Sequence, residues 1–134
     1  MSEIVIIWTV PILQVVIASG LINVWIFRFG RATKYRGAGA HTMKEEFSVY
    51  GLPSWFMYVV GFLKIVIAII LFLALFIQQL MPLLGVPALM LLSVLMLGAI
   101  TMHIKIKDPL VKILPAIGML TMALVILYIV HVVI

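Results

Sequence analysis

Four long apolar runs, separated by short polar or proline-containing stretches, dominate the pattern of this chain. The runs cover residues 4–27, 54–77, 88–104 and 110–133. Their lengths fall within the range of about 17–25 residues that a helix needs to cross the hydrocarbon core of a bilayer. Short connections favour antiparallel neighbours. We therefore expect an all-α protein, an integral membrane up-down bundle of four transmembrane helices forming a single domain over residues 1–134.

Prolines mark the expected ends of these helices. Pro53 and Pro109 stand directly before the second and fourth runs, where proline suits the start of a helix. Residues 78–87 contain Pro82, Gly85 and Pro87, so this stretch is expected to turn the chain tightly between the second and third helices.

Composition excludes a water-soluble domain. Hydrophobic residues make up 66% of the chain and charged residues 10%, against about 45–50% and 25% in soluble domains. The absence of cysteine excludes thiolate and disulfide chemistry. The net charge of +5 lies mainly between the runs and indicates no nucleic-acid partner. The expected partner is the lipid bilayer, with other membrane-complex subunits or a second copy of the chain as further possibilities.

The basic residues predict the orientation of the bundle. Five of the nine lysines and arginines lie in residues 28–53, three lie near the turn between the third and fourth runs, and the ninth is Lys64. Because lysine and arginine favour cytoplasmic loops, residues 28–53 are expected to form a basic cytoplasmic loop. Both termini then lie on the non-cytoplasmic side of the cell (inner) membrane.

Lys64 is the main candidate for function because it lies within an apolar run. Counted from Pro53, it sits about 16 Å along the second helix, near the middle of the bilayer, where an ammonium group costs at least about 2.5–3.5 kcal/mol on insertion scales. Gly61 and Ala68 form a small-residue face around it, which predicts that the lysine points into the bundle. We expect it to bind a lipophilic or anionic ligand. The alternative is a lysine that partly snorkels to hydroxyl and carbonyl oxygens.

Ser19, Ser93 and Thr121 lie at a depth comparable to that of Lys64 in the remaining runs, and Gln14 lies somewhat deeper. These four residues are expected to form a polar, ligand-binding layer with Lys64. The runs contain no acidic residue, so the lysine is either neutral through desolvation or paired with a group from outside this chain. No residue pattern indicates a catalytic site.

Four residues at the expected cytoplasmic face are further candidates: His103, Arg31, Lys34 and Arg36. His103 ends the third run, and His41 and Asp108 could approach it, but these residues lack the spacing typical of a metal site. An interfacial histidine and no metal are therefore expected. The basic residues could hold lipid phosphates, or they could serve only as positive-inside charge.

The loop also predicts a short helix. Thr42-Met-Lys-Glu45 has the pattern of a capping box, and the helix is expected to run toward Tyr50 and end at Gly51. Phe47 and Tyr50 would press its apolar face onto the membrane or the bundle. Other aromatic residues near the ends of the runs are expected to form an interfacial belt: Trp8, Trp25, Trp55, Tyr58 and Tyr128.

Three segments resemble the DoxX-like family of small four-span membrane proteins. They are Lys44-Glu-Glu-Phe-Ser-Val-Tyr-Gly-Leu-Pro53, Val60-Gly-Phe-Leu-Lys-Ile65, and Gly98-Ala-Ile-Thr-Met-His103 followed by Asp108-Pro109. The resemblance spans about residues 28–109 and implies the same four-span fold. It also implies a link to quinone-associated respiratory components and to accessory subunits of membrane complexes. Family members tend to carry glutamate where this chain has Lys64.

These observations favour a non-catalytic membrane subunit or accessory protein that binds a lipophilic or anionic ligand or docks onto a larger membrane complex. The first alternative is a quinone-linked oxidoreductase component, in which Lys64 or His103 donates a hydrogen bond to a quinone oxygen. A quinone or a lipid is accordingly the expected cofactor. The second alternative is a small-molecule transporter, which the lack of a membrane carboxylate disfavours.

Overall fold

The computed structural model describes residues 3–31 and 34–133, which form a bundle of helices. Four long apolar helices have the length and composition to cross a membrane, which confirms the expected all-α membrane bundle. They are α1 (Glu3–Ile22), α3 (Ser54–Leu73), α4 (Val86–Lys105) and α5 (Leu110–Tyr128). Short π-helical segments extend three of them, namely η1 (Asn23–Phe27), η3 (Met81–Gly85) and η4 (Ile129–Val133).

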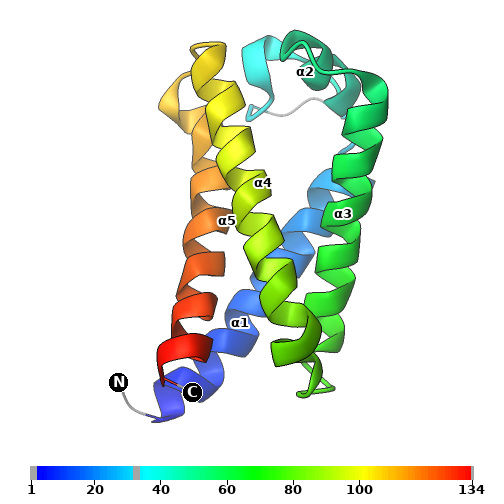
Figure 1. The fold of residues 1–134 in the computed structure, drawn as a ribbon. Coiled ribbons are helices and arrows are strands. Elements are labelled where there is room, and N and C mark those ends of the chain that lie inside the picture. Colours follow the sequence, from blue (N-terminus) through cyan, green and yellow to red (C-terminus); the bar gives the residue numbers. More distant parts are fainter. Residues whose placement is uncertain (1–2, 32–33, 134) are drawn as a thin grey trace.

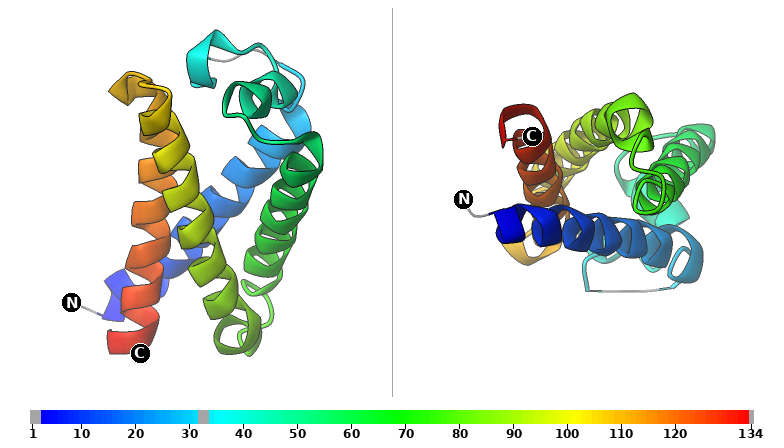
Figure 2. Two further views of the ribbon diagram at one scale, coloured as in Figure 1. Left: turned by 45° about the horizontal axis from the view of Figure 1, so that its top comes forward. Right: turned by 90° about the horizontal axis from the view of Figure 1, so that it is seen from below.

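The helices run up and down between two distinct ends (Figure 1). One end, which we call the loop end, carries the short helix α2 (Met43–Val49) and the turn between α4 and α5. The opposite end, the terminal end, lies near the first and last described residues. Figure 2 shows that α1 crosses the bundle obliquely, so that it lies beside α5 near the terminal end and beside α3 near the loop end.

The connection between α3 and α4 differs from expectation. The predicted turn over residues 78–87 and the predicted start of the third span at residue 88 are wrong, because the apolar helical stretch already begins at Met81 and runs to Lys105. Helix α3 in turn ends at Leu73. Pro82 is tolerated because it stands in the first positions of this helical stretch, where a proline breaks no hydrogen bond that the helix needs. Pro87 stands where the π-helical segment η3 passes into α4.

Helix α2 forms where the capping pattern predicts it. The Thr42 hydroxyl oxygen accepts a hydrogen bond from the backbone N–H of Glu45 at 3.1 Å. The Glu45 carboxylate accepts one from the backbone N–H of His41 at 2.7 Å. Gly51 follows the helix with a φ of +79°, a left-handed conformation that glycine adopts without strain. The predicted cap is confirmed.

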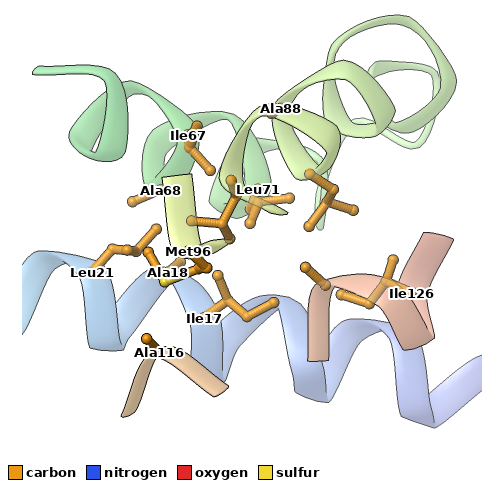
Figure 3. Close-up of a cluster of buried hydrophobic side chains, with 13 residues drawn as sticks. Ile17, Ala18, Leu21, Ile67, Ala68, Leu71, Ala88, Met96, Ala116 and Ile126 are labelled. Carbon is orange, nitrogen blue, oxygen red and sulfur yellow. The ribbon is translucent and has the colours of Figure 1, made fainter. Parts of the chain in front are cut away.

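The main apolar core lies between α1, α3, α4 and α5 (Figure 3). Ile17, Leu71, Leu89, Leu92 and Ile126 are completely buried in it. Within a bilayer the hydrophobic effect between helices is largely absent, so this core stabilises the bundle through close van der Waals packing.

A second apolar cluster lies at the loop end and contains Trp25, Met43, Phe47, Met57 and Val60. Trp25 is only 7% exposed, so its expected place in an interfacial belt is wrong. A Cβ atom at Gly61 would lie 2.6 Å from the Trp25 ring, and only glycine therefore admits the indole here. The other belt aromatics are exposed: Trp8, Trp55, Tyr58 and Tyr128.

Candidate functional site

A cavity of about 740 Å³ lies between α1, α3, α4 and α5, with residues of α2 lining its loop end. This volume falls within the range of about 300–1,000 Å³ that is typical of small-molecule pockets. Its walls are predominantly apolar. Its polar and charged lining residues are Asn23, Arg28, Tyr35, Arg36, Glu46, Tyr50, Lys64, His103 and Lys112.

Lys64 lies on the wall of this cavity and is 8% exposed, so the prediction that it faces the bundle interior is confirmed. Its Nζ atom lies 5.0 Å from the centroid of the Trp25 ring, within range of a cation–π interaction. Across residues 3–31 and 34–133, no carboxylate oxygen lies within 4.0 Å of this ammonium group. The aromatic face stabilises the charge without neutralising it.

Glu46, on the inner face of α2, joins several groups at the loop end of the cavity. One carboxylate oxygen accepts a hydrogen bond from Nη1 of Arg36 at 3.1 Å. The other accepts bonds from the Tyr50 hydroxyl at 2.6 Å and from the backbone N–H of Gly37 at 3.2 Å. Arg36 also donates to the backbone carbonyls of residues 28, 29 and 31, so both partners of this buried ion pair are further satisfied.

His103, in the last turn of α4, continues these contacts toward α5. Its Nδ1 atom lies 2.7 Å from an oxygen of Asp108, and its Nε2 atom lies 3.3 Å from the Tyr50 hydroxyl oxygen and 3.8 Å from Glu46. The ammonium of Lys112 lies 4.0 Å from the second oxygen of Asp108. We call this set the buried ion chain: Arg36, Glu46, Tyr50, His103, Asp108 and Lys112.

The geometry of the α4–α5 turn places Asp108 against His103. Lys107 has a φ of 59°, a left-handed conformation that reverses the chain after α4. The backbone N–H of Asp108 then donates to the carbonyl of His103 at 3.0 Å. The buried ion chain thus links the 28–53 loop, α4 and α5 across the loop end of the bundle.

Tyr50 is buried within this chain. Burial, followed by the negative charge of Glu46 and the hydrogen bond to it, raises the pKa of Tyr50 well above its ordinary value. The phenol therefore stays protonated at physiological pH and acts as a hydrogen-bond donor.

The other four residues of the expected polar layer do not line this cavity. Gln14 and Ser93 are buried, but Gln14 donates to the carbonyl of Leu71 at 3.1 Å and Ser93 to that of Leu89 at 2.9 Å. Ser19 and Thr121 are exposed on their helices. The expected layer is therefore not assembled, because depth along a helix sets the height of a side chain but not the direction in which it points.

Of the four candidates at the expected cytoplasmic face, two are buried and two are exposed. His103 and Arg36 belong to the buried ion chain, whereas Arg31 and Lys34 are exposed. His41 is exposed as well, and within the described part of the chain no group of three His, Asp or Glu residues could hold a metal ion.

Sequence reasoning missed Glu46, the partner of Arg36 and His103, and Lys112, the partner of Asp108. Glu46 stands four residues before Tyr50, so the two side chains lie on the same side of the helix, and this spacing could have predicted their contact. The position of Lys112 depends on the left-handed turn at Lys107, and no sequence pattern predicted this turn.

These features define an integral membrane four-helix bundle with an internal, mainly apolar cavity and a charged loop end. A model of the DoxX-like family matches residues 12–127, and the chain belongs to this family. No curated protein and no solved structure matches the chain.

Proposed function

We propose that this protein is a non-catalytic membrane component that holds a lipophilic small molecule in the cavity, with an anionic or hydrogen-bond-accepting group of the ligand against Lys64. The single observation that carries the proposal is the position of Lys64 on the wall of a cavity of about 740 Å³, without a carboxylate partner among the described residues.

The positive charge of Lys64 favours a ligand group that is anionic or a strong hydrogen-bond acceptor. Arg36 and Lys112 also line the cavity, but each has a carboxylate of this chain within 4.0 Å. Among the described residues, Lys64 has no carboxylate within 4.0 Å and lies over the Trp25 ring, although the charge of Glu46 acts on it from farther away. A buried cation is costly unless it is paired, and a ligand anion would provide the missing partner while the apolar walls receive its chain or ring.

Replacing the lysine with a neutral side chain of similar length tests this proposal. The wild type, Lys64→Met and Gln14→Met are purified in a mild detergent and examined by native mass spectrometry and lipid extraction. Gln14 is a matched control, since it is a buried polar residue of a spanning helix outside the cavity wall. We expect a small molecule to accompany the wild type and Gln14→Met but not Lys64→Met.

Equal retention by all three proteins would contradict a role for Lys64. A second protein that replaces the small molecule in these preparations would instead favour docking onto a larger membrane complex.

A quinone is the second candidate ligand. Its two carbonyl oxygens accept hydrogen bonds. Lys64 on α3 would donate to one of them, and His103 on α4 would donate to the other by exchanging its contact with Tyr50 for the quinone. Electrons would then come from a partner that carries a redox centre. A quinone in the extract of the wild type that is absent from Lys64→Met would select this candidate.

We also propose that the loop end faces the cytoplasm of a cell with this protein in its inner membrane. The basic residues of the 28–53 loop and the α4–α5 turn gather at that end, and the positive-inside rule supports this orientation. Because the chain lacks cysteine, Ser48→Cys and Gln79→Cys give single exposed thiols at the two ends. A membrane-impermeant reagent applied to intact cells should label only Gln79→Cys. Labelling of only Ser48→Cys would reverse the orientation.

A further inference from the structure

The cavity reaches the outer surface of the bundle between η1 and α5. Asn23 and Val24 of η1 and Pro115 of α5 line the cavity and are also exposed. These residues lie within the apolar stretches Glu3–Phe27 and Leu110–Val132, which have the composition of membrane spans. The opening therefore faces the lipid and not the aqueous loops.

The oblique path of α1 produces this opening. At Gly20, α1 still contacts α5, since a Cβ atom there would lie 2.4 Å from the Met119 side chain. Beyond this point η1 packs against α3, where the Trp25 ring covers Gly61. Figure 1 and Figure 2 show the same divergence of α1 from α5 toward the loop end. Gly118 of α5 lines the cavity here, and a Cβ atom on it would meet nothing within 4 Å.

The other sides of the cavity are partly obstructed. At the loop end, Arg36, Glu46 and His103 are buried and bonded to one another or to neighbours, so entry through this part of the wall would break the buried ion chain. Arg28 and Tyr35 also line the cavity at this end and are exposed, and entry from water past them is what the iodide test below examines.

On the side between α3 and α4, Phe56 and Leu95 both pack against the second apolar cluster. Val94 and Gly98 of α4 also line the cavity and are exposed, so this side is the competing route.

Resting on the proposed ligand cavity, we propose that the ligand is an amphiphile dissolved in the bilayer, which enters and leaves laterally between η1 and α5 and brings an anionic group to Lys64. This opening, lined by Asn23, Val24, Pro115 and Gly118, we call the lateral portal. A bilayer amphiphile reaches it without leaving the hydrocarbon, and the charge of Lys64 selects an anionic head over a neutral one.

The test uses Trp25 as a reporter of the cavity. Trp8→Phe and Trp55→Phe remove the other two tryptophans, both of which are exposed. The protein is reconstituted in lipid nanodiscs and mixed rapidly with stearic acid that carries a nitroxide on its chain, and quenching of Trp25 fluorescence is followed over time.

We expect the nitroxide lipid to quench Trp25, and Gly118→Leu to slow the onset of quenching about tenfold, as an added barrier of about 1.4 kcal/mol would do, with little change in its final extent. Thr101→Leu is the matched control, because it adds bulk on the exposed face of α4 away from the cavity wall. It should leave the onset unchanged.

Three results would overturn the lateral portal: an unchanged onset in Gly118→Leu, a slower onset in Gly98→Leu alone, or quenching by iodide from water in place of the nitroxide lipid. Gly98 faces the cavity from α4 and would report entry between α3 and α4.

Lys64→Met separates this inference from the proposed function. If Lys64→Met lowers the final extent of Trp25 quenching but leaves its onset normal, both the proposed function and the lateral portal are supported. If the final extent of quenching is unchanged, the role of Lys64 is rejected and the lateral portal is retained. Complete absence of quenching in the parent protein rejects both.

Discussion

At the terminal end of the bundle, Ile17, Leu71 and Leu89 pack in a continuous apolar core without solvent exposure, whereas at the loop end the helices diverge around a cavity and charged side chains connect them. The terminal half owes its stability to dispersion contacts between spanning helices. The loop half depends on the buried ion chain, whose stability requires every charge to remain paired. The comparison shows that close apolar packing holds the helices together at one end, whereas paired charges hold them together around the cavity at the other.

The largest expected effect comes from removing the charge of Glu46. Glu46→Gln leaves the buried Arg36 without its ion-pair partner and should lower the free energy of unfolding by about 3 kcal/mol. Thermal unfolding in detergent measures the loss, and hydrogen exchange should place it at the loop end. The control is Glu45→Gln, on the exposed face of the same helix, which should change little. Equal destabilisation by Glu46→Gln and Glu45→Gln would show that the ion pair of Glu46 does not stabilise the loop end.

The terminal half is tested by Leu89→Ala. Leu89 is completely buried, and the vacated space should cost about 2 kcal/mol, with little effect on the ligand cavity. Leu97→Ala on the same helix removes the same atoms from a leucine that is 53% exposed, and it should be close to neutral. If Leu89→Ala instead releases a bound ligand as readily as Lys64→Met, the two halves are coupled and the contrast between them is weaker than described.

Alkaline pH should weaken only the loop half. Because the folded protein raises the pKa of Tyr50, the protonated phenol contributes its full stability below the ordinary pKa of about 10, and that contribution falls as the pH rises above it. We expect the wild type to lose about 1 kcal/mol per pH unit above pH 10 relative to Tyr50→Phe. Thermal unfolding of both proteins between pH 8 and pH 11 measures this difference. Parallel curves would show that Tyr50 does not titrate with unfolding.

The smallest expected effect concerns the cap of α2. Thr42→Ala removes the acceptor for the Glu45 backbone N–H and should cost about 1 kcal/mol, confined to α2. Hydrogen exchange over residues 43–49 should become faster, while Ser48→Ala, at an exposed position of the same helix, should leave it unchanged. Unaltered exchange in Thr42→Ala would mean that tertiary contacts alone hold α2.

The sequence predicted those features that depend on local pattern. The apolar runs gave the four spanning helices, the Thr42 pattern gave α2, and the small residues Gly61 and Ala68 gave the inward direction of Lys64. Each of these follows from residues that are close together in the sequence, either within one apolar run or within one or two helical turns.

Features that depend on distant contacts were not predictable in this way. Ser19 and Thr121 have the depth of Lys64 but point outward, because their direction is set by how the helices rotate against one another. Trp25 turns inward because η1 packs against Gly61, far along the chain. Tyr50 and His103, separated by 53 positions, meet only in the folded bundle.

The contact between Lys64 and Trp25 has a consequence for the biogenesis of the protein. When α3 leaves the translocon, its ammonium group opposes partition into lipid by about 2.5–3.5 kcal/mol, and the other residues of this apolar helix must outweigh that cost. Synthesis delivers α1 and η1 before α3, so the indole ring already stands in the membrane when the lysine arrives. We therefore expect the N-terminal helix to assist insertion of the helix that follows it, and the order of the spans along the chain to be part of how the charge enters the bilayer.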